Sequence, residues 1–159
     1  MPALSIPAFH VSDASAVNGQ AEVFIQTRQD ATHPGTFRVA LNVVFNPAGA
    51  NDYPVGNLTI TVQLNDGAVG VFPSDNIELI NSHGVANPTV FLTGRCRDDI
   101  NPDARGCRYW LMIANNKPAA APAASTPDII GFAIHDRLGN RIAYGCGPVR
   151  AGDINVQPV

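Results

Sequence analysis

The sequence predicts an all-β domain built as an antiparallel β-sandwich, and three observations support this fold class. Apolar and polar residues alternate along several short segments, most clearly from Thr36 to Phe45, and this is the period of a half-buried strand. The 13 prolines and 14 glycines are scattered between these segments, where they mark turns. No stretch of about ten residues or more has a helical period. Two layers of strands that bury their apolar faces against each other account for all three observations.

The chain length and composition favour one folded domain. With 159 residues, the chain can bury a core without metals or many disulfides. Hydrophobic residues make up 45% and charged residues 14% of it, which excludes a disordered polar chain. We expect a single domain over residues 1–159, with an extended N-terminal arm over 1–18 and an exposed Pro/Ala-rich loop over 115–127.

The predicted strands follow one another along the chain with turn residues between them. The spacing is typical of a sandwich that is immunoglobulin-like in the broad sense, with a jelly roll or a β-barrel as alternatives. The segments before the last hairpin are Ala21 to Thr27, Thr36 to Phe45, Asn57 to Leu64, Val69 to Phe72, Ile77 to Ile80, Thr89 to Cys96 and Cys107 to Ala114. A short closing strand is expected from Asp153 to Val156.

The segment from Asp128 to Gly147 predicts a β-hairpin around a tight turn at Leu138 and Gly139. This register places Asp136 opposite Arg141 as a charge pair, Ile134 opposite Ala143 and Phe132 opposite Gly145. Both faces of the hairpin are apolar beyond the charge pair. We therefore expect strands that are covered on both sides.

Charge and hydropathy exclude several partners. The net charge of −3 and the isoelectric point near 5.7 give no basic surface for nucleic acid or for an anionic membrane. No apolar run approaches the roughly 18 residues of a spanning helix, and the N-terminus lacks the features of a signal peptide. We expect a soluble protein without membrane insertion. It stays inside a cell or virion, or it is extracellular or periplasmic if a leader was removed.

Two of the three cysteines are predicted to face each other. If the strands ending at Cys96 and starting at Cys107 pair as a hairpin, the register that places Val90 opposite Ile113 also places Cys96 opposite Cys107. A disulfide there would contribute on the order of 3 kcal/mol in an oxidising compartment. In a reducing compartment both remain free thiols.

The loop between these cysteines contains a weak calcium candidate. Asp99, Asn101 and Asp103 alternate, as oxygen ligands do in the first half of a calcium loop. No bidentate glutamate follows them, and Arg97 and Arg105 bring positive charge. A solvated loop of mutually neutralising charges is the preferred interpretation, so no metal is assigned.

No catalytic or cofactor-binding motif occurs in the sequence. It has no phosphate-binding glycine loop, no dinucleotide fingerprint and no serine-nucleophile elbow, so no catalytic residue and no cofactor are assigned. His135 is the nearest base to Cys146, but the hairpin register separates them by roughly 13 Å. Trp110 lies in a strand that is apolar on both faces, and we expect it in the core.

The favoured function is a non-catalytic structural or adhesive subunit that acts through protein–protein contacts in a larger assembly. The N-terminal arm is a candidate for self-association. The alternative is a ligand- or enzyme-binding module, such as an inhibitor or a carbohydrate- or calcium-dependent binder, that presents the loop 96–107. Neither function involves nucleic acid.

Overall fold

The computed structural model describes residues 14–25, 35–45, 54–83, 88–100, 106–116 and 127–158. These residues form nine antiparallel strands and no helix, which confirms the all-β class. The order across the sheet is β4-β3-β2-β1-β9-β8-β7-β6-β5, and the sheet is not closed. The strands are β1 (Ala14–Ile25), β2 (Gly35–Val44), β3 (Val55–Leu64), β4 (Val69–Pro73), β5 (Leu79–His83), β6 (Thr89–Cys96), β7 (Cys107–Ala114), β8 (Ile129–Asp136) and β9 (Arg141–Pro158).

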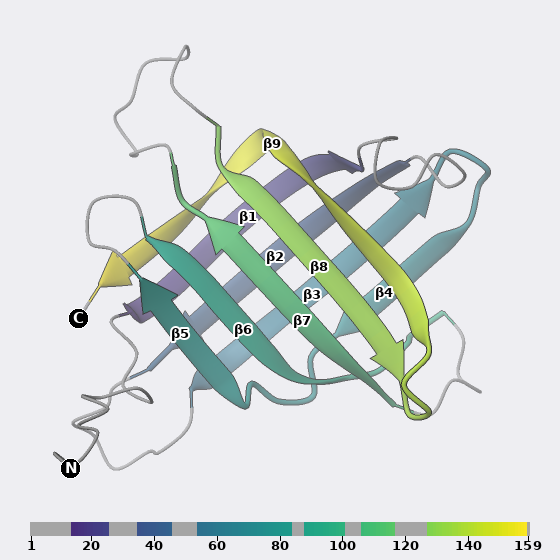
Figure 1. Cartoon of the computed structure of the whole chain (residues 1–159), viewed down its shortest axis with the longest axis horizontal. Coiled ribbons are helices and arrows are strands. Elements are labelled where there is room, and N and C mark those ends of the chain that lie inside the picture. The colour runs from purple at the N-terminus through teal and green to yellow at the C-terminus, as the bar shows by residue number, and fades with distance from the viewer. Residues whose placement is uncertain are drawn as a thin grey trace, which may run out of the picture.

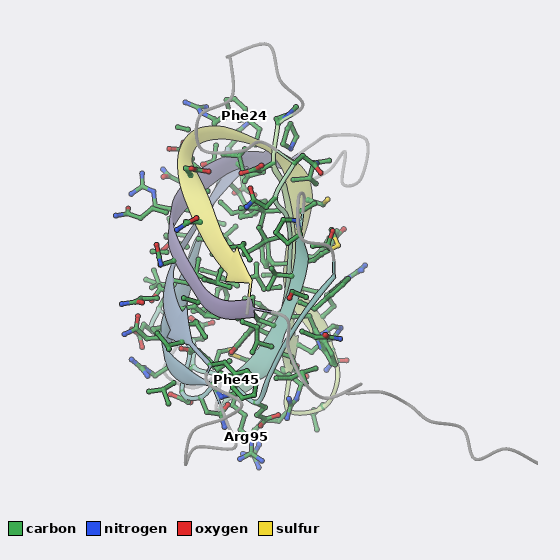
Figure 2. The ribbon with its side chains drawn as sticks, turned by 90° about the vertical axis from the view of Figure 1, so that its left-hand side faces the viewer. Phe24, Phe45 and Arg95 are labelled. Atoms are coloured by element: carbon green, nitrogen blue, oxygen red, sulfur yellow. A yellow bond between two sulfur atoms is a disulfide. The ribbon has the colours of Figure 1, made fainter. Side chains whose placement is uncertain are left out.

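The sheet is doubled over at β9, which belongs to both halves. Its first part pairs with β8, and its second part pairs with β1 from Val149 onward. The register on β1 shifts between Glu22 and Val23, so that Arg150 is the extra residue of a bulge, and bulges bend a strand. Figure 1 shows β5–β8 and the first part of β9 crossing in front of β1–β4, and the second part of β9 running beside β1. In Figure 2 the ribbon of β9 curves over one end of the molecule, near Phe24, from one layer to the other.

The apolar core lies between the two layers. The inward-facing residues of β2 and β3 are buried, and so are those of β6, β7 and β8. Phe37 on β2 and Phe132 on β8 meet edge to face across the core, with ring centroids 4.7 Å apart. Apolar and polar residues therefore alternate because one side of each strand faces the other layer, as the sequence analysis expects.

Strand bounds differ from the predictions mainly at the ends of the chain. β1 begins at Ala14, before the predicted start at Ala21, so part of the segment predicted as an arm is strand. The closing strand predicted from Asp153 to Val156 is the end of the long β9. Residues 1–13 and 117–126, which hold the rest of the arm and most of the Pro/Ala loop, lie outside the described residues.

The predicted pairing of Asp136 with Arg141 is wrong. The amide of Asp136 donates a hydrogen bond of 2.8 Å to the carbonyl of Asn140, and Arg141 pairs with His135. The register predicted farther along the hairpin is confirmed, including Ile134 opposite Ala143. Because the turn contains one residue more than predicted, β9 has a bulge at Ile142, and composition alone does not distinguish these two turn lengths.

The turn is stabilised by the Asp136 carboxylate and not by a charge pair. One of its oxygens accepts hydrogen bonds from the backbone amides of Leu138 (2.9 Å) and Asn140 (2.8 Å). These bonds, with that of Asn140 first, lower the pKa of Asp136. Gly139 has φ 85°, the left-handed conformation that glycine adopts without strain.

The cysteine register is confirmed. Cys96 lies opposite Cys107 and Val90 opposite Ile113, and the Cα atoms of the two cysteines are 4.9 Å apart. This spacing suits a disulfide, which would close the end of the β6–β7 hairpin. Cys146 lies apart from them, opposite Gly131 in the middle of the β8–β9 hairpin.

We expect thiol titration of denatured, unreduced protein to detect one reactive thiol, that of Cys146. The reason is that Cys96 and Cys107 lie directly opposite each other on β6 and β7, with Cα atoms 4.9 Å apart, as in a disulfide. After reduction the same titration should detect all 3 cysteines of the chain. Three reactive thiols without reduction would contradict the disulfide.

Candidate functional site

The two outer faces of the folded sheet differ in chemistry. The outward residues of β1, β2 and β3 are mainly polar, and Glu22 forms ion pairs with Arg38 (3.6 Å) and Arg150 (3.7 Å). Exposed apolar side chains on these strands, such as Val44 and Val55, lie at strand ends. The polar outward set comprises Asn18, Gln20, Glu22, Arg38, Asn42, Asn57, Thr59, Thr61 and Gln63. This face is that of a sheet in contact with water.

The outer face of β5–β9 is apolar by contrast, and we call it the apolar face. Two adjacent rows of outward residues run across its five strands in register. The side chains of Trp110 and Phe91 are 50% and 41% exposed, and Leu79 is 45% exposed. The first row is Leu79, Thr93, Trp110, Ala133 and Tyr144, and the second is Asn81, Phe91, Met112, Gly131 and Cys146.

This arrangement corrects two predictions about the hairpin region. Trp110 does not lie in the core, because the residues that alternate with it, Tyr109 and Leu111, are the buried ones. The β8–β9 hairpin is not covered on both sides either, since Ile142 is 43% exposed. Apolar residues on both faces of a strand were the correct signal, but they do not reveal what covers the second face.

The middle of the apolar face is a trough along β8. The outward residues of β8 there are Gly131 and Ala133, which are small. Trp110 and Met112 on β7 form one wall, and β9 forms the other about 10 Å away, two strand spacings across the sheet. A hollow of about 460 Å³ lies here and is lined almost entirely by apolar side chains.

A row of basic side chains, which we call the basic row, borders the apolar face at the turn end. Arg95, Arg108, His135 and Arg141 are neighbours on β6, β7, β8 and β9. Glu78 offsets part of this charge: its carboxylate accepts hydrogen bonds of 2.6 and 3.4 Å from Arg108. The Arg108 hydrogen bond is the main cause that lowers the pKa of Glu78. In Figure 2 the side chain of Arg95 points away from the body of the molecule.

Arg141 and Tyr144 separate the apolar face from a second hollow. The guanidinium carbon of Arg141 lies 3.9 Å from the centroid of the Tyr144 ring, a cation–π contact. The bulge at Ile142 lies between these two residues in the chain. The second hollow, of about 600 Å³, lies between this part of β9 and the β3–β4 turn, with Phe72 and Val62 among its lining residues.

The calcium candidate is only partly within the described residues. The Asp99 carboxylate accepts a hydrogen bond of 3.1 Å from Arg97, which also binds Asp75 at 2.8 Å. Asn101 and Asp103 lie outside the described residues. Where the structure describes the chain, no three His, Cys, Asp or Glu side chains gather as metal ligands do. The same residues include no helix of the length and apolarity of a membrane span.

The possible nucleophile and base also lie apart. Cys146 pairs with Gly131, and His135 pairs with Arg141 at the other end of the hairpin. Sequence reasoning found this separation, but it missed the apolar face, because it assigned the outward aromatic side chain of β7 to the core. A difference between the strands in the sequence could have revealed the apolar face. One side of β2 and of β3 is polar, whereas neither side of β7 or β8 is.

The chain matches no protein-family model, and the comparisons found no matching curated protein and no matching solved structure.

Proposed function

We propose that the protein is a non-catalytic β-sandwich subunit that joins a larger assembly through protein–protein contacts on its apolar face. The observation that carries this proposal is the contrast between the two outer faces of one folded sheet. Both faces have the same backbone geometry, yet only one has the composition of a surface in contact with water. A contiguous exposed apolar area on a soluble domain is typical of an interaction site.

The side chains on the apolar face are those that dominate binding energies. Tryptophan, tyrosine and arginine are enriched among the residues whose removal weakens interfaces most, and Trp110, Tyr144 and Arg141 lie close together here. Trp110 still exposes half of its side chain, so covering the rest would contribute roughly 2 kcal/mol. The basic row beside it supplies a polar rim.

Dye binding tests whether this face is one continuous apolar surface. At low protein concentration, we expect an apolar fluorescent dye to bind the wild-type chain, and Trp110→Asp to weaken this binding at least roughly fivefold, because a charge in the central row disrupts the surface. Thr59→Asp, an outward residue of β3 on the polar face, is the matched control and should bind dye like the wild type. Dye binding that is absent in the wild type, or unchanged by Trp110→Asp, would contradict the proposal.

The N-terminal arm remains a candidate second contact. A chain that begins at Ala14 keeps the whole of β1 and should fold like the full chain, so its association isolates the contribution of residues 1–13. If removing the arm abolishes association while the apolar face is intact, the arm is the main contact.

The alternative function, a binding module that presents the loop 96–107, has one observation in its favour. Arg97 connects Asp75 and Asp99, and the amides of Arg97 and Asp99 donate to the carbonyls of Pro73 and Val71 on β4. The first part of the loop is thus held against the neighbouring strand, and a preorganised loop binds with a lower entropic cost. This function also requires the Cys96–Cys107 disulfide, so thiol titration tests its precondition.

A further inference from the structure

We propose that the trough along β8 is a small-molecule site, and that its ligand is a linear amphiphile: an unbranched apolar chain that ends in a carboxylate. The inference rests on the same apolar face as the proposed function and goes beyond it, because it adds a ligand to a protein contact. The hollow in the trough, of about 460 Å³, has the size of a small-molecule site. Such sites are mainly apolar and have a few polar groups that orient the ligand.

The trough has a direction along β8. Its floor is formed by Gly131 and Ala133, and the next outward residue of the same strand is His135. These three positions follow one another at about 7 Å, two residues of strand at a time. The trough is therefore apolar over Gly131 and reaches the basic row at His135. An unbranched chain can lie along this line with its head group at the basic end.

The wall on β9 brings a positive charge to the trough itself. Among the described residues that line the hollow, Arg141 is the only charged one, and the others include Trp110, Met112 and Tyr144. The guanidinium of Arg141 lies over the Tyr144 ring, at 3.9 Å from its centroid. It can still donate two parallel hydrogen bonds to a carboxylate, because the N–H donors of a guanidinium lie in its own plane.

The charge of the basic row selects an acidic head group. Arg95 and Arg108 share the carboxylate of Glu78, at 3.6 and 2.6 Å. Arg141 lines the second hollow together with Asp98. Three arginines therefore lie near two carboxylates, although the whole chain has a net charge of −3. A carboxylate at this end of the trough complements the local excess of positive charge, whereas a cationic head would oppose it.

Amphiphiles with the same chain and opposite heads test the choice of ligand. Trp110 lines the hollow and is the only tryptophan, so its emission reports whether the trough is occupied. In dilute protein, dodecanoate below its micelle concentration should shift this emission to the blue and reduce its quenching by acrylamide. Dodecyltrimethylammonium, which has the same chain and a cationic head, should bind at least roughly tenfold more weakly.

The length of the chain tests whether the apolar part lies in the trough. A methylene that is half covered should tighten binding about twofold, because full burial corresponds to roughly fourfold. Octanoate has four methylenes fewer than dodecanoate and should therefore bind at least about tenfold more weakly. Equal affinity for the two carboxylates would overturn the inference, because the chain would then contribute nothing.

Variants of Arg141 test the head-group contact. Arg141→Gln should weaken dodecanoate at least roughly tenfold, because it removes charge-assisted hydrogen bonds, and it should not weaken the cationic amphiphile. Arg141→Lys keeps the charge and should bind dodecanoate more tightly than Arg141→Gln. Arg38→Gln is the matched control, since Arg38 is an exposed arginine on the polar face, and it should bind like the wild type.

A variant that fills the trough tests the position of the chain. Gly131→Leu should weaken both amphiphiles at least roughly tenfold, because its side chain occupies the hollow. A Cβ on Gly131 would lie 3.5 Å from the sulfur of Cys146, which is ordinary contact, and Gly131 is not one of the glycines with positive φ. Far-ultraviolet circular dichroism and melting check the fold. If Gly131→Leu does not fold, Ala133→Leu on the same floor replaces it.

The outcomes separate this inference from the proposed function. If dodecanoate binds no more tightly than the cationic amphiphile, or if Arg141→Gln does not weaken it, the acidic ligand is overturned. If neither amphiphile protects Trp110 while dye binding depends on Trp110, the inference is overturned and the apolar face is left for a partner protein. If dye binding also fails, the proposed function is overturned with it.

Discussion

Replacing Phe37 with alanine should lower the free energy of unfolding by about 3–5 kcal/mol. Phe37 is 1% exposed, and its ring meets that of Phe132 with centroids 4.7 Å apart. The two residues belong to β2 and β8, which lie in opposite layers of the doubled sheet. Truncation therefore removes apolar contacts at the point where the layers meet, and it leaves a cavity that neighbouring strands cannot close without shifting.

Urea unfolding of the wild type, Phe37→Ala and Phe24→Ala measures this effect. Phe24 is a matched control because its side chain is 51% exposed, and the guanidinium carbon of Arg150 lies 4.0 Å from the centroid of its ring. Its truncation should cost less than about 1 kcal/mol. Similar losses for the two variants would show that the layers do not share one core.

Gly19→Ala should lower the free energy of unfolding by about 3 kcal/mol or more. Gly19 lies in β1, between β2 and β9, with φ 137°. A Cβ at this position would overlap the carbonyl oxygen of Asp153 on β9. The substitution therefore imposes an unfavourable backbone conformation and also pushes apart the two strands that join the halves of the sheet.

Gly67→Ala separates these two effects. Gly67, in the β3–β4 turn, also has positive φ, but a Cβ there would have no neighbour within 4 Å. Its substitution should cost about 1–2 kcal/mol, the conformational part alone. If thermal or urea unfolding finds Gly19→Ala no worse than Gly67→Ala, the close approach of β1 and β9 is wrong.

Periodicity predicted the strands well because the cause of periodicity is local. A residue such as Val39 or Ile60 points to the same side as residues two positions away, whatever the topology. The β6–β7 register was predictable for a similar reason: Cys96 and Cys107 end strands that are adjacent in the chain. These features need no knowledge of how distant segments meet.

Two kinds of feature were not predictable from the sequence: those that depend on contacts between distant segments, and those that change when a turn is one residue longer. The bulge at Ile142 depends on how Asp136 accepts amide hydrogen bonds, and composition does not specify this. The length of β9 depends on its pairing with β1, about 130 residues earlier in the chain. The bulge lies between Arg141 and Tyr144, which border the apolar face.

The apolar face shows a more general limit. A strand that is apolar on both sides, such as β7, is typical of a sheet that is covered on both sides. Sequence assigns the cover to the same chain by default, and Trp110 was therefore expected in the core. The doubled sheet leaves this side open in the described residues, and we propose that another molecule covers it.

Acrylamide quenching of tryptophan emission in dilute protein tests most directly whether this face is open in the single chain. Trp110 is the only tryptophan of the chain, so the signal reports on the apolar face alone. We predict strong quenching, because half of the Trp110 side chain is exposed. Weak quenching with blue-shifted emission in dilute protein would contradict the account.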